Sequence, residues 1–130
     1  MLKVMLIEDD QTMVSLLTTL LKMEGFIVKT PSNHQMDGLF NAIVHDRPQI
    51  AFVDVKLRSG SGIDLVRKIR KDPDIKDTRI LMSSGFNVQH ECIQAGADGF
   101  ILKPFMPDDL IKLIHKTIKN KKNIEKEEKV

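Results

Sequence analysis

The sequence predicts one α/β domain with a five-stranded parallel sheet and helices on both of its faces. Short apolar runs alternate with amphipathic helical segments along the chain, and polar residues follow the strongest runs. A length of 130 residues fits a single domain with its own hydrophobic core.

Five apolar runs are predicted as strands, because strands of a parallel sheet are buried on both faces and lack polar alternation. They cover residues 4–7, 26–28, 50–53, 80–82 and 100–102, and the second is the weakest. In each interval between runs, and after the last one, apolar residues recur at helical spacing. These predicted helices cover residues 13–21, 36–43, 63–69, 88–93 and 110–118. Strict alternation of predicted strands and helices implies parallel strands joined by helical crossovers.

Composition sets broad limits on function. Hydrophobic residues make up 42% and charged residues 29% of the chain, as in ordinary globular proteins, and the net charge is only +2. Such a charge gives no reason to expect direct binding to nucleic acid or to a membrane. Cys92 is the single cysteine, so no intramolecular disulfide can form. With no signal peptide or membrane span evident, we expect a cytoplasmic protein.

The domain is expected to cover residues 1–120. Residues 121–130 are rich in Lys, Asn and Glu, and they are interpreted as a charged tail or the start of a linker. Their mixed charges argue against a nucleic-acid-binding arm.

Polar residues of specific kinds follow the four strong runs. They are Glu8, Asp9 and Asp10, then Asp54, then Ser83 and Ser84, and finally Lys103. Ligands of open α/β sheets bind at the carboxyl ends of the strands, so these side chains should share one binding edge. Asp10 is expected to cap the first helix, and Ser84 to have a structural role.

These residues, with Gly62 and the segment 96–105, resemble the receiver domains of two-component response regulators over about residues 3–120. The resemblance implies a flavodoxin-like fold with strand order 2-1-3-4-5. It also implies a cis peptide between Lys103 and Pro104. The sequence departs from the common family pattern where Arg58 replaces a frequent Pro, Ser83 a Thr, and Phe100 a Tyr or another aromatic. Asp98-Gly99 also stands where the winged-helix transcription-factor branch typically has two acidic residues, which weakens the expectation of that branch's dimer interface.

A magnesium site is expected at the acidic cluster. The first and third strands would be neighbours, roughly 4.8 Å apart, so we expect Asp9 and Asp54 to face each other. Clustered carboxylates raise one another's pKa unless a cation lies among them, and Mg²⁺ prefers oxygen ligands. The resemblance implies direct ligation by Asp9 and Asp54, a water-mediated contact from Glu8, and a further ligand in the backbone carbonyl of Lys56.

Asp54 is the predicted phosphoryl acceptor, because a carboxylate can attack phosphorus and form an aspartyl phosphate. Lys103 would neutralise a phosphoryl oxygen with its long side chain, and Ser83 would donate its hydroxyl. Ser83 and Phe100 form a predicted switch that reshapes the face made by the fourth helix, fifth strand and fifth helix.

The leading interpretation is a signalling switch that promotes its own phosphorylation and dephosphorylation but is not an enzyme in the usual sense. The phosphoryl donor would be a histidine kinase or phosphotransfer protein, the output target is unknown, and the chain would be a monomer or a weak phosphorylation-dependent dimer. A phosphatase-like hydrolase fits poorly, because Glu8 occupies the place of its nucleophile. A flavin-binding module would need a loop rich in Ser, Thr and Gly after the first strand. A fourth interpretation is a degenerate receiver that serves only as an interaction scaffold. The presence of Asp54, Lys103 and the complete acidic cluster argues against it.

Overall fold

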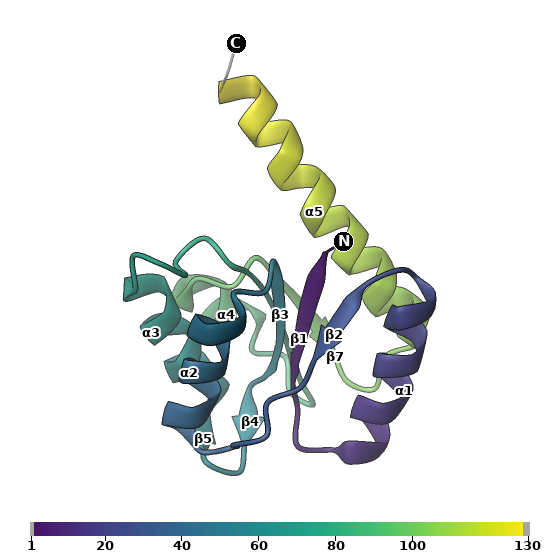
Figure 1. Cartoon of the computed structure of the whole chain (residues 1–130), viewed down its shortest axis with the longest axis vertical. Helices are drawn as coiled ribbons and strands as arrows, with labels where there is room; N and C mark the ends of the chain where they lie inside the picture. The colour runs from purple at the N-terminus through teal and green to yellow at the C-terminus, as the bar shows by residue number, and fades with distance from the viewer. Residues whose placement is uncertain (1, 129–130) are drawn as a thin grey trace.

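The computed structural model describes residues 2–128, with side chains described as far as residue 119. Its main sheet has the order β2-β1-β3-β6-β7, and all neighbouring strands are parallel (Figure 1). The strands are β1 (Lys3–Ile7), β2 (Ile27–Lys29), β3 (Ile50–Asp54), β6 (Arg79–Ser84) and β7 (Gly99–Leu102). Taken in chain order, these five strands have the predicted order 2-1-3-4-5, so the flavodoxin-like architecture is confirmed.

Each predicted helix is also present. They are α1 (Gln11–Met23), α2 (Met36–Asp46), α3 (Gly62–Lys71), α4 (Gln89–Ala95) and α5 (Pro107–Glu128). The end of α5 projects beyond the body of the domain (Figure 1). Because α5 runs from Pro107 to Glu128, the expected domain boundary at residue 120 falls inside this helix. No helix in the described part of the chain is both long and apolar enough to cross a membrane.

The sheet separates two hydrophobic clusters, because successive strand residues point to opposite faces. Met5 and Ile7 pack with residues of α2, α3 and α4, whereas Val4 and Leu6 pack with residues of α1 and α5. All four of these β1 side chains are at most 1% exposed. Burial on both faces explains why the strands read as continuous apolar runs.

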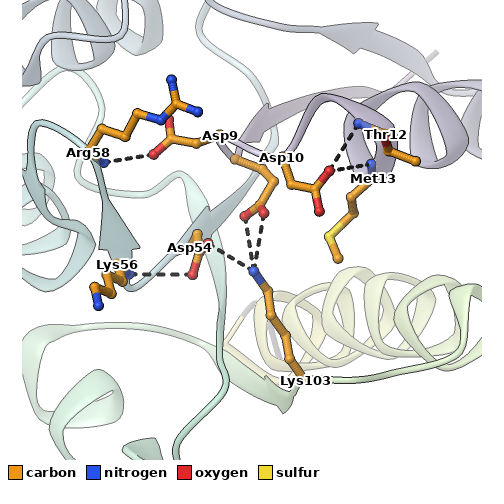
Figure 2. A network of polar contacts seen from close by, with 9 residues as sticks. Asp9, Asp10, Thr12, Met13, Asp54, Lys56, Arg58 and Lys103 are labelled. Carbon is orange, nitrogen blue, oxygen red and sulfur yellow. Dashed lines mark hydrogen bonds and ion pairs between the residues drawn. The ribbon is translucent and has the colours of Figure 1, made fainter.

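A small antiparallel hairpin was not predicted. It consists of β4 (Lys56–Leu57) and β5 (Gly60–Ser61), and it lies between β3 and α3. Each of its strands has only two residues, which is too short to leave a periodic pattern in the sequence. The hairpin places the backbone after Asp54 close to the carboxyl edge of the sheet (Figure 2).

At the opposite edge, the Arg70 guanidinium ties the end of α3 to two loops. It donates to the backbone oxygens of Gly96 (2.8 Å), Lys76 (2.6 Å) and Thr78 (2.5 Å). It also pairs with Asp98 Oδ2 at 3.0 Å, and the same oxygen accepts a hydrogen bond from the backbone N–H of Ile80 at 2.7 Å. This network links the last turn of α3 to the starts of β6 and β7.

Candidate functional site

Strand register brings the predicted residues to one edge of the sheet. Ile7 of β1 pairs with Val53 of β3, so Glu8 follows in the position opposite Asp54. On the other side of β3, Asp54 pairs with Ser83 of β6. Lys103 directly follows β7, and its side chain reaches back toward β3 (Figure 2). The carboxyl ends of four strands therefore form one polar site.

The Lys103 ammonium lies between two carboxylates (Figure 2). Its Nζ donates to Asp54 Oδ2 at 2.9 Å and to the two oxygens of Glu8 at 3.2 and 3.3 Å. Burial alone lowers the pKa of Lys103, but the hydrogen bonds and negative charges of Asp54 and Glu8 outweigh it and raise the pKa. The predicted cis peptide between Lys103 and Pro104 is present.

Glu8, rather than Asp9, faces Asp54. Its residue is 3% exposed, and its pKa rises from 4.5 to about 7. Burial is the largest cause, and a hydrogen bond and the negative charge of Asp54 add to it, while Lys103 acts in the opposite direction. Glu8 is therefore harder to ionise in the folded protein than in the unfolded chain.

The Asp9 carboxylate points away from this pair, so its expected position opposite Asp54 is wrong by one residue of strand register. Asp9 Oδ2 accepts a hydrogen bond from the backbone N–H of Arg58 at 2.7 Å (Figure 2). Asp9 Oδ1 lies 3.6 Å from His34 Nδ1. Successive side chains of a strand point to opposite sides, and the register places Glu8 opposite Asp54. Asp9, the next residue, is therefore directed elsewhere.

The donor atoms suit a hard divalent cation. Glu8 and Asp54 are buried carboxylates, 3% and 8% exposed, and burial followed by the neighbouring Asp54 raises the pKa of Glu8. The described His, Cys, Asp and Glu side chains form no group of three that could hold a metal ion as they stand, and Asp9 is turned toward Arg58. The set fits Mg²⁺ if Asp9 turns inward, because carboxylate and carbonyl oxygens are its preferred ligands.

The Ser83 hydroxyl is a buried donor without a partner among the described residues. The residue is 0% exposed, and its Oγ has no hydrogen bond. Such groups are uncommon, because leaving a hydroxyl unpaired in the interior is unfavourable. Ser83 pairs with Asp54 across neighbouring strands, so its hydroxyl is available to an oxygen atom bound at Asp54.

Two neighbouring polar residues have the expected structural roles. Asp10 caps α1, accepting hydrogen bonds from the backbone N–H groups of Thr12 at 3.0 Å and Met13 at 3.2 Å (Figure 2). Ser84 Oγ accepts from the backbone N–H of Phe86 at 3.1 Å and so orders the loop before α4.

Gly62 lies against Asp54, and Phe100 lies on the strand that leads to Lys103. A Cβ atom at Gly62 would collide with the backbone oxygen of Asp54, so only glycine allows this close approach of α3 to β3. Phe100 lies on β7 opposite Met82 and packs, half-buried, against the cluster that includes α4. Its ring is therefore on the sheet face predicted for the switch.

Solved structures share this fold. The chemotaxis response regulator CheY4 of Vibrio cholerae superposes with a TM-score of 0.82 at 24% identity, covering 90% of this chain and 98% of that one. The receiver domain of sensor histidine kinase PA1611 from Pseudomonas aeruginosa PAO1, with a magnesium ion coordinated in its active site cleft, superposes with a TM-score of 0.79 at 20% identity. That match covers 90% of this chain and 97% of the other.

Sequence relatives agree with the fold. The cell cycle transcriptional regulator CtrA of Caulobacter vibrioides is 32% identical over 122 residues, which are 93% of this chain and 52% of CtrA. The chain thus spans about half the length of these curated relatives. The family sequence model for the response regulator receiver domain matches residues 4–115 of this chain. Together with the sheet order and the site at its carboxyl edge, this match shows that the chain belongs to the response regulator receiver domains of two-component systems.

Proposed function

We propose that this receiver accepts a phosphoryl group on Asp54 from the phosphohistidine of a histidine kinase or phosphotransfer protein. One arrangement carries the proposal: Asp54 lies 2.9 Å from the Lys103 ammonium and beside the buried, unpaired hydroxyl of Ser83. A phosphoryl group would bring additional negative oxygens to the site, and a nearby cation and an unused hydroxyl donor can stabilise them.

In the transfer step, an Asp54 carboxylate oxygen forms a bond to phosphorus while the phosphorus–nitrogen bond of the donor breaks. The donor imidazole leaves with that electron pair. Lys103 turns from the carboxylate to a phosphoryl oxygen, and Ser83 donates to another. Positioning and charge neutralisation account for this chemistry, so no strong base is required.

The metal ligands in this proposal are Asp9, Asp54 and the backbone carbonyl of Lys56, with Glu8 acting through water. Bound Mg²⁺ supplies positive charge that neutralises the phosphoryl oxygens during transfer. The convergence of the Glu8 and Asp54 carboxylates on one ammonium supports this assignment.

The output would be a conformational change rather than a released product. Ser83 moving toward the phosphoryl group would leave room for Phe100, and the α4–β7–α5 face would change shape for a partner protein. The protein would act in the cytoplasm as a monomer or weak phosphorylation-dependent dimer. It would not be an enzyme in the usual sense, although its own residues promote phosphorylation and dephosphorylation.

The test is incubation with acetyl phosphate and Mg²⁺, followed by intact-mass measurement. We expect the mass of one added phosphoryl group, in an adduct labile to base and hydroxylamine, and no adduct on Asp54→Asn. Asp64→Asn, on the exposed side of α3, is the matched control and should label like the wild type. Equal labelling of Asp54→Asn and the wild type would disprove the assignment.

A further inference from the structure

The tip of the β4–β5 hairpin holds the Asp9 carboxylate through its backbone. The Arg58 N–H donates to Asp9 Oδ2 at 2.7 Å, although the two residues are 49 positions apart. His34 Nδ1 lies 3.6 Å from the other oxygen, Oδ1. In Figure 2 the Asp9 carboxylate is turned toward the Arg58 N–H, whereas Asp54 is hydrogen-bonded to Lys103.

This contact competes with the proposed role of Asp9 in metal binding. Glu8 and Asp54 converge on the Lys103 ammonium, and Asp9 has no contact with that ammonium among the described interactions. To share a cation with Asp54, the Asp9 carboxylate has to turn inward and leave the Arg58 N–H. A hydrogen bond from an N–H to a carboxylate is among the stronger ones, so the turn has a measurable cost.

We propose that the Arg58 N–H is a latch that holds Asp9 outward in the metal-free protein and releases it when a divalent cation binds. This inference rests on the proposed magnesium site. Arg58 is a positioning residue: it acts through Asp9, and through its backbone rather than its exposed guanidinium. Metal binding thereby frees the tip of the hairpin from the loop that follows β1.

Release of the hairpin would also affect a pocket that the hairpin helps to form. An open pocket of about 430 Å³ is lined by Val55, which follows Asp54, and by the hairpin residues Lys56, Gly60 and Ser61. The loop before α4 contributes Ser84 and Phe86. The latch would therefore connect occupancy of the metal site to one wall of a pocket whose other wall is the loop before α4.

Proline at position 58 removes the donor of the latch. Proline has no N–H and needs a φ near −65°. Arg47 is the only non-glycine residue with positive φ in the described part of the chain, so φ is negative at Arg58. Leu57 lies in β4 and has the extended backbone that is preferred before proline. Arg58→Ala is the matched control, because it removes the guanidinium and keeps the N–H.

The experiment is calorimetric titration of the whole chain with Mg²⁺ alone, since the protein has no Trp or Tyr for fluorescence. Arg58→Pro should bind Mg²⁺ about tenfold more tightly than Arg58→Ala, because Asp9 no longer has to leave a donor. Asp9→Ala should bind much more weakly than the wild type. Equal or weaker binding by Arg58→Pro, with binding lost in Asp9→Ala, would overturn the latch alone. Wild-type affinity in Asp9→Ala would overturn the proposed metal site and the latch with it.

Hydrogen exchange in the wild type tests the latch without a substitution. The Arg58 amide should be protected in EDTA, because it donates to Asp9, and should exchange faster when Mg²⁺ saturates the protein. Unchanged protection of this amide at saturation would overturn the latch.

Discussion

The Lys103 ammonium lies 2.9 Å from Asp54 Oδ2 and also contacts both oxygens of Glu8, which is 95 residues away in the sequence. One cation therefore serves two buried carboxylates. Burial, and then the hydrogen bond and negative charge of Asp54, raise the pKa of Glu8, while Lys103 acts in the opposite direction.

Lys103→Met should destabilise the metal-free protein by about 1–3 kcal/mol. Removing one partner of a buried ion pair leaves an uncompensated charge, and the partial exposure of the Lys103 side chain, 22%, reduces the full cost. Urea unfolding in EDTA near neutral pH measures the effect. Lys68→Met is the matched control: its partner Asp37 is 91% exposed, so the loss should stay below about 1 kcal/mol. Similar losses in the two variants would contradict the central role of Lys103.

Glu8→Gln should change how stability depends on pH. The folded-state pKa of Glu8, about 7, lies above the ordinary value of 4.5, so ionisation is less favourable in the folded state. The wild type therefore has its full stability from this group below about pH 4.5 and loses it as the pH rises through about 7. Glu8→Gln cannot ionise and should lose less stability over this interval.

Urea unfolding in EDTA at several pH values between about 5 and 8 checks this sign. Glu91→Gln, at an exposed position of α4, is the matched control and should follow the wild-type profile. Parallel profiles for Glu8→Gln and the wild type would show that folding does not raise the pKa of Glu8.

Arg70→Met should destabilise the fold by about 2–4 kcal/mol, because it leaves three backbone carbonyls and Asp98 without their shared donor. Arg67→Met removes a guanidinium one turn earlier in α3. It pairs with Asp64, and both side chains are more than half exposed, so the cost should stay below about 1 kcal/mol. Thermal or urea unfolding of the two variants would contradict the prediction if their losses were alike.

Sequence patterns predicted the main sheet and its helices because both depend on repeated apolar burial. The runs at 4–7 and 50–53 are apolar on every residue, and the structure buries both faces of β1 and β3. Strand ends then placed Asp54, Ser83 and Lys103 on one edge, because topology alone brings carboxyl ends together.

The position of the Asp9 side chain could not be predicted in the same way. It depends on a one-residue register between β1 and β3 and on a backbone N–H in the unpredicted hairpin. The sequence did mark the relevant position, since Arg58 stands where a proline without an N–H is frequent in the resembling family. The network around Arg70 was also missed, because its acceptors are mostly backbone carbonyls that leave no trace in side-chain patterns.

Ser83→Ala should leave the stability of the unphosphorylated protein within about 1 kcal/mol of the wild type, or raise it. Its Oγ is buried without a partner, so its removal loses no hydrogen bond and relieves an unpaired polar group. Ser84→Ala is the neighbouring control. It loses the hydrogen bond from the Phe86 N–H and should cost about 0.5–1.5 kcal/mol.

The same substitution should uncouple the phosphoryl site from the α4–β7–α5 face. In the wild type, an oxygen or fluorine atom of a phosphate mimic at Asp54 can accept from the Ser83 hydroxyl, and a charge-assisted bond of about 1.5–3 kcal/mol shifts a two-state equilibrium roughly tenfold or more. NMR spectra with beryllofluoride and Mg²⁺ should show changes in the Phe100 ring and in α4 for the wild type and much smaller changes for Ser83→Ala. If Phe100 and α4 respond equally in both proteins while Asp54 is fully occupied, the face is driven by a contact other than the Ser83 hydroxyl.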